Sequence, residues 1–89
     1  MLNTMIIVHM KEPKYAEWKE AFDGDKERQA HFMKDAVVGR VDERTAMVTA
    51  DVFDRPALQA LLKSDEFHHM ENEMGLSHEF FELTPQGLN

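Results

Sequence analysis

The sequence predicts an α+β fold in which a four-stranded antiparallel sheet carries its helices on one face. Short apolar runs and amphipathic helical runs alternate in the order strand, helix, strand, strand, helix, strand. The inner strands are apolar on both faces, because their alternate positions show little polar contrast. Two helices cover only one face of such a sheet, so we expect a second copy of the chain to cover the other face.

Length and composition limit the class of protein. A chain of 89 residues forms one domain over 1–89, without room for a second core. The chain has no cysteine, so oligomerisation rather than disulfides is expected to add the stability that a small domain needs. A net charge of −7 disfavours nucleic acid and anionic membranes as partners. The first apolar run is too short for a secretion signal or a membrane span, and we expect a cytoplasmic protein.

The first strand is predicted at 5–10, and it ends before Pro13, which cannot extend a strand but can open a helix. In the helix that follows, Tyr15, Trp18 and Phe22 form one apolar stripe. The stripe loses phase at 23–25, where we expect the helix to end or kink. A looser helical stretch then resumes through Arg28, Ala30 and Met33.

The second and third strands are predicted at 36–41 and 45–53, joined by the polar turn 42–44. Short connections and the handedness rules favour a ferredoxin-like βαββαβ sheet with strands one and three in the centre. In strand one, alternation separates Ile6, Val8 and Met10 on one face from Met5, Ile7 and His9 on the other.

Capping residues mark the second helical region. Asp54 is a good N-cap, with Pro56 in the first turn, for a helix with an apolar stripe at Leu58, Leu61 and Leu62. Ser64 caps a second segment, with a stripe at Phe67, Met70 and Met74, and Gly75 suits the left-handed position after it. The fourth strand is predicted at 78–83, and a polar tail over 84–89 is expected to be mobile.

Four parts of the chain carry a resemblance to a known family: the segments 8–10, 15–23, 64–67 with Met70 and Gly75, and 79–83. Through them most of the chain, roughly 5–83, resembles the dimeric α/β-barrel superfamily, in particular small relatives of the antibiotic-biosynthesis monooxygenases. The resemblance implies a homodimer formed through the sheet face and a substrate site between the sheet and its own helices. The superfamily includes cofactor-free monooxygenases, isomerases, haem-degrading enzymes and stress proteins, so the fold does not select a reaction.

The sequence departs from the haem-degrading members of this superfamily. Their ligand histidine on the last helix corresponds to Glu71, their strand-one asparagine to His9, and their tryptophan to Val52 or Phe53. These three departures argue against haem, and we expect no cofactor.

His9 is a polar residue in the most apolar strand. It could act as a general acid or base, because an unperturbed imidazole titrates near neutrality, or it could be a paired histidine in the core or interface. Asp51 in strand three could orient His9, or it could lie in water near a strand end.

The stripe of Tyr15, Trp18 and Phe22, together with Met70, could line a pocket for an apolar or aromatic molecule. The same stripe is also what any helix needs to pack on a sheet. Glu66, His69 and Glu73 share a helix face, but a solvated face is the simpler interpretation, and we predict no metal site. His31 and His78 are isolated and are given no role.

The sequence thus predicts a cytoplasmic homodimer that binds a small apolar or aromatic molecule in a helix–sheet cleft. A cofactor-independent monooxygenase or isomerase, with His9 and Asp51 in catalysis, is one hypothesis. A non-enzymatic ligand-binding or stability-related assembly module is the other. A cavity that touches His9 favours the first hypothesis, and a cleft filled by Trp18, Phe22, Leu61 and Met70 favours the second.

Overall fold

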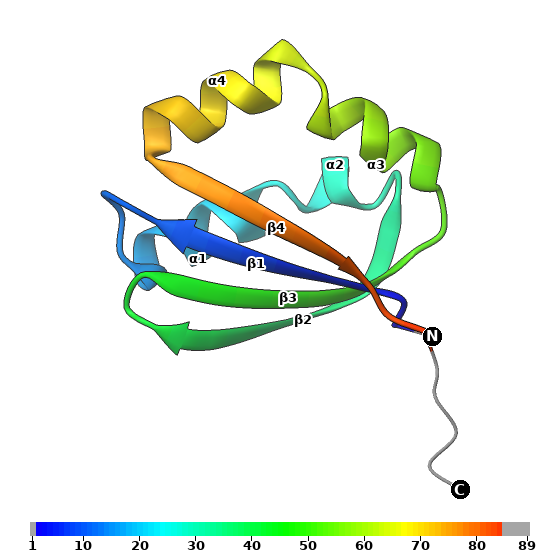
Figure 1. The fold of residues 1–89 in the computed structure, drawn as a ribbon, viewed down its shortest axis with the longest axis horizontal. Helices are drawn as coiled ribbons and strands as arrows, with labels where there is room; N and C mark the ends of the chain where they lie inside the picture. Colours follow the sequence, from blue (N-terminus) through cyan, green and yellow to red (C-terminus); the bar gives the residue numbers. More distant parts are fainter. Residues whose placement is uncertain (1, 85–89) are drawn as a thin grey trace, which may run out of the picture.

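The computed structural model describes residues 2–84, which form a four-stranded antiparallel sheet with helices packed on one face (Figure 1). The elements are β1 (Thr4–Met10), α1 (Tyr15–Gly24), α2 (Lys26–Gln29), β2 (Met33–Asp42), β3 (Thr45–Val52), α3 (Arg55–Leu62), α4 (Asp65–Met74) and β4 (Leu76–Glu82). Figure 1 shows α1 and α2 behind the strands, and α3 followed by α4 above them. The predicted ferredoxin-like fold is confirmed. No helix within residues 2–84 is long and apolar enough to cross a membrane.

The strand order is β2-β3-β1-β4, so strands one and three are central, as predicted. In the register, Val8 lies between Ala46 of β3 and His78 of β4, and His9 lies between Thr45 and Ser77. Opposite residues of an antiparallel pair project to the same face. Val8 and His78 therefore face the helices, whereas His9 faces away from them.

The core lies between the helices and the inner face of the sheet. One cluster of buried side chains consists of Val8, Met10, Trp18, Ala46, Val48 and Leu76. A second consists of Phe32, Met33, Ala50, Val52 and Leu58. The alternating burial of β3, where every second residue from Ala46 to Val52 is buried, follows from the two-residue period of a strand.

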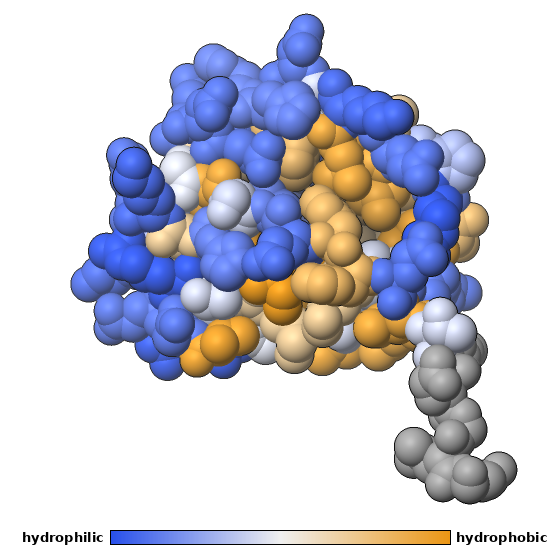
Figure 2. All heavy atoms as spheres, viewed as in Figure 1, coloured by the Kyte–Doolittle hydropathy of each residue, from blue (hydrophilic) through white to orange (hydrophobic). Residues whose placement is uncertain are grey.

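The outer face of the sheet combines apolar and polar side chains. Register places Met5, Ile7, Met47, Val37 and Phe81 on this face, and the last three are exposed. Figure 2, which has the same viewpoint as Figure 1, shows hydrophobic residues right of the centre and along the lower edge, with hydrophilic residues along the top, the left side and the right edge.

The predicted caps are confirmed. The Asp54 carboxylate accepts a hydrogen bond from the Ala57 amide at 3.1 Å, and the Ser64 hydroxyl accepts one from the Phe67 amide at 3.2 Å. Gly75 follows α4 with φ of 66°, the left-handed conformation that favours glycine. These caps fix where α3 and α4 begin and how the chain turns into β4.

The prediction of a helical stretch through Met33 is wrong. The structure ends α2 at Gln29, and Met33 is the first residue of β2, where it pairs with Val52 and is buried in the second core cluster. Strand β2 then has an irregular register between Lys34 and Val37, and Asp35 within it has φ of 55°. This irregularity breaks the alternation from which the strand start was predicted.

The other strand boundaries differ by one or two residues from the prediction. Strand β1 begins at Thr4, β3 ends at Val52, and β4 spans Leu76–Glu82 rather than 78–83. The turn between β2 and β3 contains only Glu43 and Arg44. Of the tail predicted over 84–89, residues 85–89 lie outside the described part of the chain.

Candidate ligand-binding cleft

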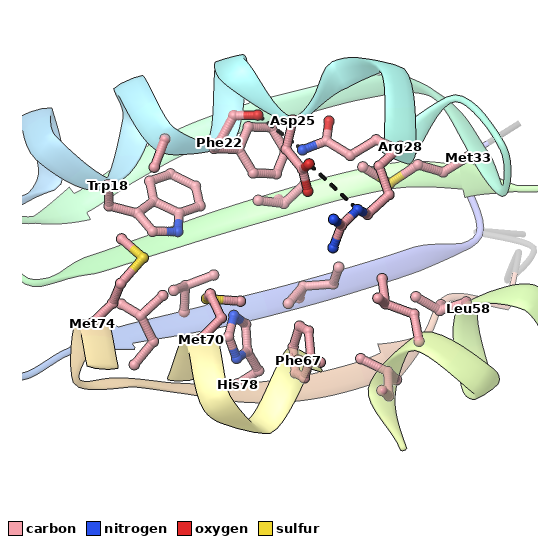
Figure 3. A pocket seen from close by; sticks show the side chains of 18 of the residues that line it. Trp18, Phe22, Asp25, Arg28, Met33, Leu58, Phe67, Met70, Met74 and His78 are labelled. Carbon is pink, nitrogen blue, oxygen red and sulfur yellow. Dashed lines mark hydrogen bonds and ion pairs between the residues drawn. The ribbon is translucent and has the colours of Figure 1, made fainter. Parts of the chain in front are cut away.

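A cleft with a volume of about 500 Å³ lies between the inner face of the sheet and two helical walls. Figure 3 shows Trp18 and Phe22 on one side, from α1, and Met70, Met74 and Phe67 on the opposite side, from α4. The strands form the floor through Ile6, Val8 and Val48. This volume falls within the range that holds a small organic ligand.

Aromatic rings form the α1 wall of the cleft. The centroids of Trp18 and Phe22 are 5.0 Å apart, with 32° between the ring planes, and Trp18 is only 4% exposed. On the α4 wall, the methionine side chains of Met70 and Met74 are flexible and polarisable, so they adapt to ligands of different shape. The cleft therefore offers a rigid flat surface opposite an adaptable one.

His78 brings a polar group into this apolar space. It projects from β4 into the cleft (Figure 3), and its side chain is 9% exposed. Its Nδ1 lies 2.8 Å from Oε2 of Glu71 on α4. The imidazole is flanked by the rings of Phe67 and Phe80, with centroids at 5.1 Å and 6.1 Å.

Charged residues lie at the α2 side of the cleft. The Arg28 guanidinium donates a hydrogen bond to the Glu66 carboxylate of α4 at 2.9 Å, and it lies 3.6 Å from the Asp25 carboxylate. Figure 3 shows the Arg28 side chain reaching from α2 toward the cleft. This ion pair connects α2 to α4.

Three of the four predicted pocket residues line the cleft: Trp18, Phe22 and Met70. Tyr15 is not among the lining residues. Its ring lies 5.9 Å from Trp18, and it packs against the first core cluster, so it supports the aromatic wall from behind. The cleft is open rather than filled by these side chains, but His9 does not touch it.

The structure does not bring His9 and Asp51 together. His9 is on the outer face of the sheet, where its Nε2 lies 2.5 Å from Oε1 of Glu79. It pairs with Thr45, six residues before Asp51 along β3, a separation of about 20 Å. Asp51 instead lies near the Asn3 amide at 3.5 Å and the Lys34 ammonium at 4.0 Å.

His78 lines the cleft, although the sequence analysis gave it no role. Its partner Glu71 is in a different element, so no helical or strand spacing connects them. A signal was available in the alternation of Leu76, His78 and Phe80, which predicts one shared strand face. His69, by contrast, pairs with Glu73 at the surface of α4, outside the cleft.

Comparisons with known proteins establish the fold. No protein-family model and no curated protein matches the chain. Among solved structures, it is similar to SnoaB, a cofactor-independent oxygenase from Streptomyces nogalater, with a TM-score of 0.63 and 16% identity over 97% of this chain and 95% of that chain. A mutant form of SnoaB matches over the same shares, with a TM-score of 0.61 and 16% identity. This likeness agrees with the predicted ferredoxin-like fold, and a fold does not by itself determine an activity.

Proposed function

We propose that this protein binds a small, planar, largely apolar molecule in the cleft and acts on it as a cofactor-independent monooxygenase. The observation that carries the proposal is the open cleft of about 500 Å³, with an aromatic wall at Trp18 and Phe22 and a methionine wall at Met70 and Met74. The fold likeness to a cofactor-independent oxygenase supports the choice of reaction.

The lining of the cleft suits a reaction of this kind. Without a cofactor, the protein has to bind the substrate, exclude water and move protons. Apolar side chains on the floor and both walls perform the first two tasks. An isomerase has to perform the same three tasks, so isomerisation is the other reaction that this cleft could support.

We also propose that the protein is a cytoplasmic homodimer joined through the outer sheet face. Support comes from the apolar residues Ile7, Met47 and Phe81, which register places on that face, and from the small size of the core. The net charge of −7 and the lack of cysteine support the proposed cytoplasmic location. Sedimentation at micromolar concentration tests the dimer, because a species of single-chain mass would contradict it.

A ligand screen tests the binding. Small planar aromatic compounds should raise the melting temperature and quench the fluorescence of Trp18, which is the single tryptophan of the chain. A matched variant, Met70→Gln, should weaken both effects, whereas His9→Ala, on the far side of the sheet, should leave binding unchanged. If no compound stabilises the protein, the binding proposal fails.

Oxygen consumption separates the enzyme from a non-enzymatic binding module. Compounds that bind should also consume dioxygen in the presence of the protein and release an oxidised product. Binding without turnover of any bound compound would instead support the ligand-binding alternative. That alternative is favoured by one observation, the position of His9 outside the cleft.

A further inference from the structure

The cleft contains one imidazole, and that imidazole is held by a carboxylate. Of the residues that line it, Asp25, Arg28, Glu66 and His78 carry charge or titrate. Arg28 interacts with both Asp25 and Glu66. His78 alone projects from the sheet, between the rings of Phe67 and Phe80.

Glu71 determines which nitrogen of His78 carries the hydrogen of the neutral ring. An ionised carboxylate only accepts hydrogen bonds, so the hydrogen of a neutral ring lies on Nδ1, which donates to Glu71 at 2.8 Å. The lone pair of Nε2 is then available to accept a proton. Within residues 2–84, no side-chain nitrogen or oxygen is both buried and without a hydrogen-bond partner, so Nε2 of His78 is not a buried unpaired atom.

The Glu71 carboxylate has a second interaction partner on the solvent side, the exposed His68. Its second oxygen, Oε1, lies 3.3 Å from Nδ1 of His68, whose side chain is 58% exposed. The carboxylate therefore has partners on both oxygens, which offsets the cost of keeping a charge that is only 19% exposed. The three groups run from the cleft to the surface in the order His78, Glu71, His68.

We propose that His78 is the proton acceptor of the cleft and that Glu71 is its positioning residue. This inference rests on the proposed function, because it requires a ligand in the cleft. A ligand with an acidic O–H group donates its proton to Nε2, and the O–H electron pair stays on the ligand as an oxyanion. The imidazolium that forms lies between the oxyanion and the Glu71 carboxylate, and Nδ1–H continues to donate to Glu71.

A chromophoric phenol provides a direct test. Para-nitrophenol is neutral and nearly colourless when protonated and absorbs visible light as the phenolate, so its absorbance reports proton transfer. Its binding in the cleft is followed separately through the fluorescence of Trp18. We expect the bound dye to ionise more readily on the parent protein than on His78→Gln, by about tenfold in the ionisation constant, as for a hydrogen bond to a charged group.

Two further variants distinguish a chemical role from a structural one. Glu71→Gln should keep the dye bound and give an ionisation constant between those of the parent and His78→Gln. His9→Gln is the matched control, because His9 also pairs with a glutamate but on the outer face, and it should change nothing. NMR of the ring nitrogens should find the hydrogen of neutral His78 on Nδ1 in the parent, and on both nitrogens in exchange in Glu71→Gln.

The outcomes separate the two proposals. One outcome is that the dye quenches Trp18 equally in the parent and in His78→Gln and has the same ionisation constant in both. That result would overturn the assignment of His78 as proton acceptor, but the cleft would still be a binding site. Absence of any dye binding to the folded parent would overturn the binding proposal and this inference with it. A ring hydrogen found on Nε2 in the parent would contradict the role of Glu71.

Discussion

Arg28 of α2 and Glu66 of α4 form an ion pair, with 2.9 Å between Nη2 and Oε1, that connects these two helices beside the cleft. Both side chains line the cleft, and both are largely exposed, at 47% and 72%. An exposed pair of this kind contributes only about 0.2–1 kcal/mol. The pair therefore adds little to the stability of the fold.

Breaking this pair should speed the entry of a ligand. Glu66→Gln should raise the association rate of a neutral apolar fluorophore by about twofold to fivefold, equivalent to roughly 0.5–1 kcal/mol. Stopped-flow fluorescence measures the rate. Glu82→Gln is the matched control, because Glu82 is 74% exposed and pairs with Arg55 at 3.0 Å, and neither residue lines the cleft. Equal rates for the two variants would show that the Arg28–Glu66 pair does not limit entry.

Gly75 is required by the turn from α4 into β4. Alanine at this position would keep φ of 66° only with strain, and its Cβ would lie 3.3 Å from Cβ of Lys11. Gly75→Ala should lower the free energy of unfolding by about 1–2 kcal/mol. Urea unfolding measures the change. The slope of the unfolding free energy against urea concentration should be the same in the parent and the variant.

Gly24→Ala is the control for this prediction, and the expected sign is opposite. Gly24 ends α1, and an added Cβ would meet nothing within 4 Å. The alanine should be neutral or stabilise by up to about 1 kcal/mol, since glycine costs entropy in a helix. A loss of stability in Gly24→Ala as large as that in Gly75→Ala would refute the argument from the left-handed conformation.

The carboxylate of Asp42 should make stability depend on pH in acid. The backbone amide of Arg44 donates to it at 2.8 Å, and this hydrogen bond, followed by one from Thr45, holds the pKa of Asp42 below its ordinary value. A lowered folded-state pKa means that the contribution is complete above about pH 4 and is lost as the pH falls through the folded pKa.

Comparison with Asp42→Ala tests this dependence. The parent should be more stable than the variant near neutrality, and the difference should shrink toward strongly acidic pH. Asp42→Asn keeps an acceptor oxygen but cannot ionise, so its difference from Asp42→Ala should not change with pH. Chemical unfolding at a series of pH values measures both stability differences. If the parent became more stable relative to Asp42→Ala on acidification, the predicted direction of the pH dependence would be wrong.

The faces of the sheet and the starts of the helices could be predicted because they depend on local rules. The period of a strand separates Val8 from His9 whatever the rest of the fold does, and the register confirms the separation. Asp54 and Ser64 each accept a hydrogen bond from the amide three residues later, so the sequence alone reveals them. Met33 was mispredicted because its strand pairing with Val52 is a tertiary contact that overrides local spacing.

The cleft residues that come from the helices could be predicted, whereas the role of His78 from β4 could not. Trp18, Phe22 and Met70 belong to amphipathic helices, whose apolar stripes must face the sheet. His78 depends on the packing of α4 against β4, which brings Glu71 to it from seven residues earlier in the chain. His9 was the more conspicuous histidine in the sequence, but register turns it to the outer face, toward Glu79.

The outer face should determine the assembly of the chain. Met47 lies on β3, a central strand, opposite Ile7 on that face, and it is 36% exposed. Met47→Glu would place an uncompensated charge in an apolar interface, so the proposed dimer should dissociate. Analytical ultracentrifugation at micromolar concentration should then give single-chain mass, while circular dichroism stays that of the folded parent.

Gln59→Glu is the matched control for Met47→Glu, because it adds the same charge at an exposed position of α3, which packs on the inner side of the sheet. It should remain a dimer. If both variants stay dimeric, another surface joins the chains, and Met47, Ile7 and Phe81 are simply exposed. If both dissociate, net charge rather than the outer face governs association. Only dissociation confined to Met47→Glu makes the sheet itself the interface, with each cleft facing outward from the pair.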